Sequence, residues 1–168
     1  MFLDFDVPHT LLFCTLPRLP LFTAEVVCRT DELSTLCTLV GGFPDLVDAL
    51  SDPTATFTLF APNNDAFMNI DTSGLDSDGV LSLLQFHALA DEEKRSTDLV
   101  CDEMFTMVNG EVSTTTCDDN ADPMEFFQAG AANDRASPPQ IIRADTECSN
   151  GVIHILDEVM LFEDLPPP

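Results

Sequence analysis

Three histidines give this chain of 168 residues side chains that titrate near neutral pH and can move protons. His87 follows Leu83 and Leu84 at helical spacing, and His154 lies inside the apolar run GVIHIL. With a nearby carboxylate, either imidazole could serve a secreted hydrolase or a secreted small-ligand-binding protein. We favour structural hydrogen bonds for both, because neither a Gly-x-Ser-x-Gly elbow nor a His-Glu-x-x-His helix accompanies them. The chain is therefore predicted not to be an enzyme, and no cofactor is expected.

Six cysteines supply a second kind of chemistry, and they are many for a chain of this length. None forms a Cys-x-x-Cys pair, and no paired Cys/His spacing resembles a zinc site. Disulfide bonds formed in an oxidising compartment are the better explanation. Cys148 is expected to pair with Cys28 or Cys37, and Cys14 either takes the remaining partner or stays free.

Cys101 and Cys117 are expected to form a disulfide of their own. They flank two strand-like runs around Asn109-Gly110, a dipeptide suited to a type I′ hairpin turn. In a perfect two-residue hairpin Cys101 would lie opposite Asp118, so Cys117 is one residue out of register. A bridge between the two cysteines therefore requires a bulge or a frayed strand end.

Carboxylates are the third reactive group, because 30 acidic and 6 basic residues give a net charge of -24. The densest cluster, Asp118–Asp122, could bind a divalent cation weakly, although a solvated acidic loop is the favoured interpretation. The segment DTSGLDSDG does not match an EF-hand, because with Gly79 as the loop glycine the last ligand position is Gln85. We therefore predict a spread acidic surface whose effects depend on salt, and no dedicated metal site.

The same charge limits the partners that the protein can bind. Nucleic acids and anionic lipid surfaces are both recognised through Lys and Arg, which are scarce here. No apolar run approaches the roughly 20 residues that cross a bilayer, so membrane insertion is not expected. The expected partner is an extracellular protein or a glycan. Weak binding of a divalent cation is also considered.

The elements that must position these residues follow from the apolar pattern. Helical spacing predicts a first helix from its N-cap at Thr30 to Val40, and capping residues predict further helical segments. These segments are residues 43–51, the turn that follows Asn63 or Asn64, and residues 77–90.

Strands are predicted over residues 55–61 and on both sides of two Asn-Gly turns, Asn109-Gly110 and Asn150-Gly151. Residues 120–140 are expected to form a long loop around a short apolar island, residues 124–127. The order of helices, strand, helices and two hairpins predicts an α+β fold with antiparallel sheets.

Two of these segments resemble the signatures of the fasciclin (FAS1) domain family. FTLFAPNNDAF, residues 57–67, is similar to the first signature, a strand followed by Phe-Ala-Pro, polar residues and Ala-Phe. NGVIHILDEVML, residues 150–161, is similar to the second. Between them LLQFHAL falls where the family carries a leucine-rich helix ending in a histidine. The resemblance spans about residues 30–162, with the motifs in family order.

This resemblance implies a wedge of two β-sheets with helices packed over it, and an extracellular or cell-surface location. It implies an adhesion or matrix-interaction module rather than an enzyme. Residues 1–25 would be an N-terminal arm or a degraded leader, and residues 26–168 a single FAS1 domain. The candidate motif or partner-binding residues are Phe86, His87, Asn150, Gly151 and His154.

The chain departs from the integrin-linked motifs of animal cell-adhesion members of this family. Their Tyr-His motif would fall at Phe86-His87, so the phenolic hydroxyl is missing. Their Asp-Ile motif would fall near Asp145-Thr146, so the isoleucine is missing, and the chain contains no Arg-Gly-Asp. An integrin partner is therefore not expected.

Overall fold

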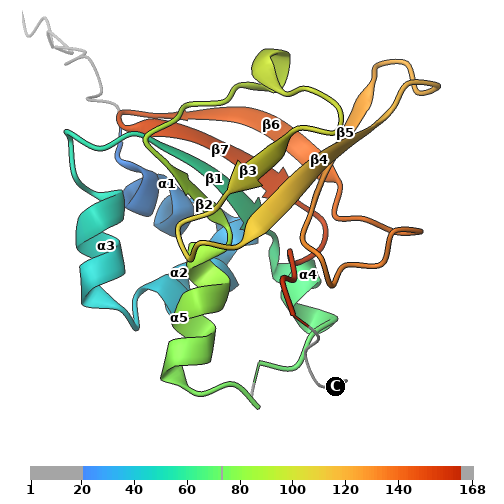
Figure 1. The fold of residues 1–168 in the computed structure, drawn as a ribbon. Coiled ribbons are helices and arrows are strands. Elements are labelled where there is room, and N and C mark those ends of the chain that lie inside the picture. Colours follow the sequence, from blue (N-terminus) through green and yellow to red (C-terminus); the bar gives the residue numbers. More distant parts are fainter. Residues whose placement is uncertain (1–20, 73, 164–168) are drawn as a thin grey trace, which may run out of the picture.

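The computed structural model describes residues 21–72 and 74–163, which contain five α-helices, two 3-10 turns and seven strands (Figure 1). The helices and 3-10 turns, in chain order, are α1 (Thr23–Arg29), η1 (Asp31–Leu33), α2 (Ser34–Val40), α3 (Pro44–Leu50), α4 (Asn64–Met68), α5 (Ser77–Gln85) and η2 (Ser96–Asp98). The strands are β1 (Phe57–Pro62), β2 (Ala88–Ala90), β3 (Met104–Thr106), β4 (Val112–Asp118), β5 (Glu125–Ala129), β6 (Ile141–Cys148) and β7 (Gly151–Leu156). In this part of the chain no helix has the length and apolar character that a membrane-spanning helix requires.

The strands form two sheets, one of four strands in the order β2-β1-β7-β6 and one of three strands in the order β3-β4-β5. Every residue of the two central strands, β1 and β7, is buried. A strand that is covered on both faces needs apolar residues throughout, which explains the near-continuous apolar runs FTLFAP and GVIHIL. Helices cover one face of these strands and the three-stranded sheet covers the other (Figure 1).

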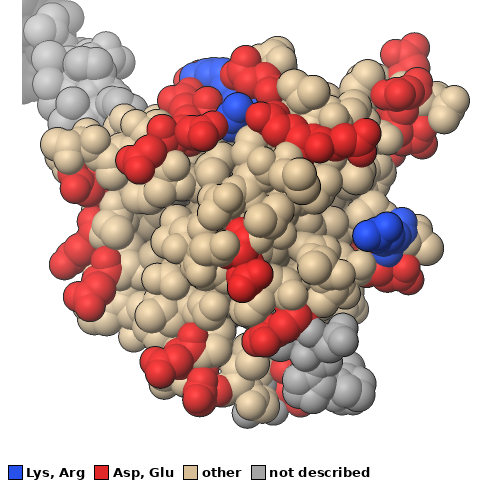
Figure 2. Space-filling model, in the orientation of Figure 1, with Lys and Arg blue, Asp and Glu red and all other residues tan. Residues whose placement is uncertain are grey.

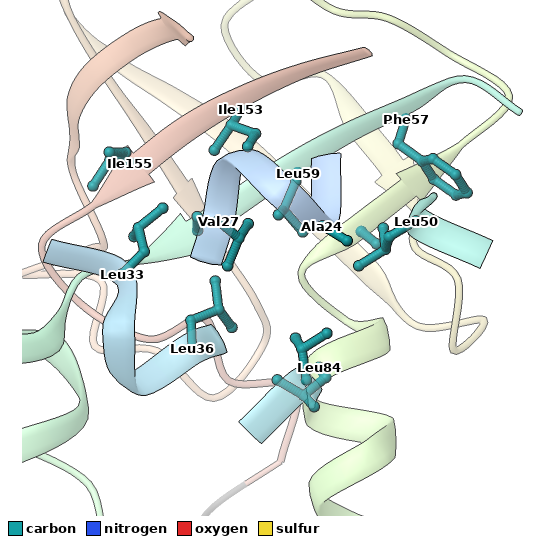
Figure 3. Packing of buried hydrophobic residues seen from close by; sticks show 13 residues of the cluster. Ala24, Val27, Leu33, Leu36, Leu50, Phe57, Leu59, Leu84, Ile153 and Ile155 are labelled. Carbon is teal, nitrogen blue, oxygen red and sulfur yellow. The ribbon is translucent and has the colours of Figure 1, made fainter. Parts of the chain in front are cut away.

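The larger core lies between the helices and the four-stranded sheet. Figure 3 shows Leu59 of β1 and Ile153 of β7 facing Val27 of α1 and Leu36 of α2. Alternate residues of β1 point to this side because successive side chains of a strand face opposite ways. Residues on the other side, such as Phe60, join a second core between the sheets.

The α+β class with two sheets and covering helices is confirmed, but the fully antiparallel arrangement is wrong. Strand β1 pairs with β7 in parallel, from Phe57 opposite Gly151 to Pro62 opposite Leu156. Apolar alternation reports which face a residue occupies and carries no information about the direction of a neighbouring strand. The parallel pair joins two segments that are far apart in sequence, so no short-range pattern could predict it.

Two element boundaries also differ from the prediction. The helix predicted to run to Ala90 ends at Gln85, and Ala88–Ala90 instead forms β2, which pairs with the start of β1. Residues 125–127 of the apolar island predicted to lie in a loop belong to β5, whose Phe127 pairs with Thr116 of β4. Ala88–Ala90 has no strong strand propensity of its own, and β1 provides its hydrogen bonds. Phe126 and Phe127 do favour a strand, but the Asp, Gly and Pro residues on either side of them indicated a loop.

Both predicted hairpins and two of the predicted caps are confirmed, but the type I′ turn at Asn109-Gly110 is wrong, because Gly110 has a positive φ and Asn109 does not. The side chain of Asn63 accepts a hydrogen bond from the Ala66 amide at 2.8 Å, and that of Asp76 accepts one from Gly79 at 2.8 Å. Thr30 is not a side-chain cap, because its hydroxyl donates to the Val26 carbonyl in the preceding helix.

The domain includes residues that the sequence assigned to an N-terminal arm. Helix α1 begins at Thr23, and both the Thr23 amide and its hydroxyl donate to the side chain of Asn150, at 2.9 and 2.8 Å. The predicted boundary at residue 26 therefore falls inside a helix that is fastened to the β6–β7 turn. Residues 1–20 of the predicted arm lie outside the described residues.

Candidate functional site

His87 follows α5 and is 2% exposed. Its Nδ1 lies 2.8 Å from the Leu83 carbonyl, and its Nε2 accepts a hydrogen bond from the Met160 amide at 3.0 Å. Nδ1 therefore carries the proton that is donated to Leu83. Burial lowers the pKa of His87 to about 4, against the raising effect of the Leu83 hydrogen bond. A neutral imidazole thus joins α5 to the segment that follows β7.

His154 occupies the centre of β7 and is fully buried. Its Nε2 donates to the Lys94 carbonyl at 2.7 Å, its Nδ1 accepts from the Asp145 amide at 3.3 Å, and its ring stacks on Phe60. Burial lowers the pKa of His154, although the Lys94 hydrogen bond and the Asp145 charge act in the opposite direction. The imidazole holds the loop before η2 and the irregular part of β6 against β7.

Asp145, at the position of the family's Asp-Ile motif, has a backbone φ of 58°. Its carboxylate accepts hydrogen bonds from the hydroxyl and the amide of Ser96. Burial raises the pKa of Asp145, but these hydrogen bonds outweigh it and hold the pKa below its ordinary value. The carboxylate is therefore ionised and engaged in fastening the loop, and it has no open approach to the His154 ring nitrogens, which are both bonded to backbone groups.

Ser149 and Asn150 form the turn between β6 and β7, Gly151 begins β7 opposite Cys148, and Asn150 is 4% exposed. Its side-chain amide nitrogen donates to the carbonyls of Leu50 and Asp52 at 3.0 and 3.2 Å. Together with the Thr23 contacts, one buried side chain joins the start of α1, the end of α3 and the β6–β7 turn. Such a fully bonded amide is a structural anchor.

The five candidate motif residues are therefore close to the core and bonded within the protein. Phe86 is fully buried and packs edge-on against Phe162 at a centroid distance of 5.2 Å. A role for any of these residues in contacting a partner stays a prediction. Because these residues are buried, a partner would contact the surface residues that pack against them and not the five residues themselves.

The predicted disulfide between Cys101 and Cys117 is confirmed, with Cα atoms 5.5 Å apart. The observed register, with Met104 opposite Thr114, continues to place Cys101 directly opposite Cys117. The Met107 amide donates to the Glu111 carbonyl, so the hairpin loop has three residues, and this extra residue removes the one-residue mismatch expected for a two-residue turn. The predicted pairing of Cys148 is wrong, because Cys28 of α1 bonds to Cys37 of α2. Burial of the Cys148 thiol raises its pKa to about 11.

Sequence reasoning missed the Cys28–Cys37 bond because both cysteines lie in neighbouring helices rather than in one hairpin. The turn through η1 reverses the chain between α1 and α2 and brings the Cα atoms of Cys28 and Cys37 to within 5.0 Å of each other. A sequence separation of 9 between two predicted helical segments is the signal that could have suggested this bond.

The acidic segment Asp118–Asp122 forms a turn in which the Asp118 carboxylate accepts hydrogen bonds from the amide and side chain of Asn120. Across residues 21–72 and 74–163, no group of three or more His, Cys, Asp or Glu side chains is placed to hold a metal ion. Weak binding of a divalent cation therefore stays a prediction. A spread acidic surface remains the favoured interpretation of the acidic residues.

We expect sodium and calcium to stabilise the fold alike as ionic strength rises from very low to moderate values. Repulsion between carboxylates destabilises the compact state, and salt screens this repulsion, to a range of about 8 Å at physiological salt. Matched melting curves in sodium and calcium chloride test this, with Asp119→Asn as the variant. A saturable melting shift at micromolar calcium, lost in Asp119→Asn and absent with sodium, would contradict the expectation.

Among the cavities on the surface of the described part of the chain, two are well formed, and neither of these is lined by a histidine. The first, the α3–α5 groove, has a volume of about 370 Å³ and lies between α3, α5 and the β3–β4 turn. Its walls are mainly apolar and include Phe43, Leu46, Leu81 and Val108. Because these residues come from three separate segments, no motif in the sequence could have identified the groove.

The second, the sheet cavity, has a volume of about 490 Å³ and lies on the outer face of the three-stranded sheet. The outward-facing threonines of β4, Thr114 and Thr116, line one side of it, and residues 129–138 line the other. Residues 113–116 are Ser or Thr on both faces of β4, so the sequence pattern alone does not show which of them line a cavity.

The fasciclin domain family model matches residues 31–162 of the chain. The chain belongs to the fasciclin domain family. The match covers both signature segments and agrees with the extent of the resemblance, residues 30–162. Both the fold and the buried motif residues described above are thus properties of a FAS1 domain in this chain.

Three known proteins show how far this likeness extends. Protein sll1483 and Uncharacterized protein sll1735, both of Synechocystis sp., are 29% and 27% identical to the chain; each alignment covers 82% of it, and 71% and 96% of the relative. The structure of a FAS1 domain pair from the insect cell adhesion molecule Fasciclin I matches with a TM-score of 0.65 at 18% identity, which shows a shared fold. That match covers 84% of this chain and 51% of the insect chain, so this chain spans about half of the domain pair.

Proposed function

We propose that this FAS1 domain is an extracellular adhesion or matrix-interaction module that binds a protein partner through the α3–α5 groove. The observation that carries the proposal is an apolar groove on a face with few charges in a protein of net charge -24. Fasciclin-type domains act generally in cell adhesion, and the two disulfides fit an oxidising extracellular location.

The groove offers the features of a protein-binding surface. Phe43, Leu46 and Leu81 are only partly buried, so apolar area remains for a partner to cover. Val108 is 41% exposed at the edge of the groove. Burial of apolar area contributes about 25 cal/mol per Å², so a partner that fills the groove gains binding energy at its centre.

Charge defines the partner that fits this groove. The sequences of α3 and α5 contain Asp45, Asp48 and Asp78 and no Lys or Arg. Figure 2 shows a mainly uncharged face with carboxylates around its margin and one further carboxylate patch near its middle. The best occupant is therefore an apolar protein segment flanked by Lys or Arg, because complementary charge around an apolar centre favours association.

Attachment of cells to a surface coated with the protein tests the function, and peptide binding tests the groove. We expect Val108→Glu to abolish most cell attachment and most binding of an apolar peptide library flanked by Lys and Arg. Val100→Glu is the matched control, because Val100 is 60% exposed and does not line the groove. Equal loss in both variants, or equal binding of a library flanked by Glu, would contradict the proposal.

The alternative function, a hydrolase or small-ligand-binding protein that uses a histidine and a carboxylate, receives no support from these contacts. His87 and His154 use both ring nitrogens in bonds to backbone groups. A general base needs a ring nitrogen within reach of the substrate. We therefore propose a binding module and not an enzyme.

A further inference from the structure

We propose that the sheet cavity is a binding site for a neutral saccharide of one or two sugar units. The site is defined by Asp102, Thr114, Thr116 and Arg135, and it is separate from the α3–α5 groove. Four observations lead to this ligand: free hydroxyls, an unpaired guanidinium, rigid walls and a partly apolar lining.

The threonine hydroxyls are the first observation. On the inner face of β4, Ser113 and Thr115 are buried and hydrogen-bond to the side chain of Gln128 at 2.7 and 2.6 Å. On the outer face, the hydroxyls of Thr114 and Thr116 have no hydrogen-bond partner within the described residues, and both line the cavity. Because Thr114 and Thr116 are two residues apart on one strand, their hydroxyls face the same way and can hydrogen-bond to neighbouring groups of one ligand.

Arg135 and Asp102 are the second observation. Four of the five Lys and Arg residues in the described part of the chain form ion pairs with Glu, namely Arg29, Lys94, Arg95 and Arg143. Arg135 forms no ion pair there, although carboxylates outnumber cations fivefold in the whole chain. Asp102, which also lines the cavity, has no side-chain partner among the described residues either. The cavity therefore presents a carboxylate and a guanidinium that do not neutralise each other.

The first wall of the cavity is rigid. The Cys101–Cys117 disulfide lies directly beside Asp102 and Thr116 in sequence and fixes the two segments that carry them. The Asp102 amide also donates to the Thr115 carbonyl at 2.8 Å.

The second wall is rigid for a different reason. The Asn133 side chain accepts hydrogen bonds from the amides of Gly130 and Leu161 and donates to the Val159 carbonyl, at 2.8 to 2.9 Å. These bonds fasten the loop that carries Arg135 to the segment after β7. A ligand that binds between two pre-organised walls loses little affinity to ordering of the protein.

The chemistry of these groups fits a sugar. A pyranose presents adjacent hydroxyls that donate to a carboxylate and accept from a guanidinium, and its C–H faces contact apolar side chains such as Val112 and Pro138. A volume of about 490 Å³ lies within the range of small-ligand sites. A neutral sugar is favoured over an anionic one because the net charge of -24 repels polyanions.

Amide chemical shifts of the full protein, titrated with a panel of neutral mono- and disaccharides at millimolar concentrations, test the proposal. The panel includes glucose, galactose, mannose, maltose, cellobiose and lactose, and acetate serves as the simple-anion arm. We expect at least one sugar to shift residues 112–116 and 129–138 while the groove residues stay unchanged. The double variant Thr114→Val and Thr116→Val, and separately Asp102→Asn, should each weaken that binding about tenfold or more.

Matched variants distinguish this site from general effects on the sheet. Valine keeps the β-branched shape of threonine, and Thr106→Val on neighbouring β3 changes an exposed threonine that does not line the cavity. Asn tolerates the positive φ of 64° at Asp102, so Asp102→Asn keeps the backbone. Absence of a shift with every sugar would overturn the proposal, as would equal loss in Thr106→Val. A shift at Arg135 with acetate alone would also overturn it, because it would show a simple anion site.

Discussion

Gly151→Ala is expected to prevent folding, or to lower the free energy of unfolding by more than about 4 kcal/mol. Gly151 has a φ of 146°, which side chains rarely adopt, and a Cβ atom there would lie 1.9 Å from the Phe57 carbonyl oxygen. The clash cannot be relieved by a side-chain movement, because the contacted atoms belong to the backbone of β1. Both β1 and β7 are fully buried, so neither strand can move away without disturbing two cores.

Gly110→Ala is the matched control for this prediction. Gly110 also follows an asparagine at a hairpin turn and has a φ of 89°, but apart from its own chain neighbours no atom of the described residues lies within 4 Å of the position that a Cβ atom would take. The substitution should therefore lower the free energy of unfolding by only about 1 kcal/mol. Chemical denaturation of both variants measures the difference, and comparable losses for the two would show that the Phe57 contact is unimportant.

These two glycines also show how much of the fold could be predicted from the sequence. Both hairpins were predicted, because the Asn-Gly dipeptide and the flanking apolar runs are local signals. The difference between the two glycines was not predictable, because it depends on the parallel pairing of β7 with β1. Residue 57 is nearly a hundred positions away in the chain, and no local pattern records such a contact.

The candidate sites follow the same division. The signature segments in FTLFAPNNDAF and NGVIHILDEVML identified the family, because their residues hold the two central strands and their turns. The two cavities were not predicted, because each is assembled at the surface from separate segments. One of the two disulfides was predictable and the other was not. The hairpin pattern predicted the Cys101–Cys117 bond, whereas the Cys28–Cys37 bond depends on how two helices pack.

The second large effect that we expect is a loss of stability in mild acid caused by the buried histidines. In the folded protein the pKa of His87 is about 4, whereas its ordinary value is 6.5. Between these two values the unfolded chain binds a proton that the folded protein does not, so acid favours unfolding. The contribution of His87 is complete above pH 6.5 and is lost as the pH falls toward 4, by about 3 kcal/mol in all.

His154 acts in the same direction, since burial lowers its pKa as well. Relief of repulsion among the carboxylates acts oppositely, but most carboxylates begin to bind protons only below about pH 5. The histidines should therefore dominate between pH 6.5 and about 5, where we expect the free energy of unfolding to fall.

Chemical denaturation at a series of pH values from 7.5 downward measures this slope, and histidine substitutions assign it. His87→Gln and His154→Gln should each lower the stability at pH 7.5, because each removes a buried ring whose nitrogens are both bonded. Each substitution should also reduce the slope of the free energy of unfolding against pH below pH 6.5, by an amount that corresponds to up to one bound proton. A purely structural loss would lower the stability at every pH without changing this slope. The folded protein offers an independent check by magnetic resonance, because the His87 ring should stay neutral well below pH 6.5. A His87 signal that titrates near 6.5 while the protein stays folded would show that the ring is accessible to solvent, and would make this residue a candidate binding group again.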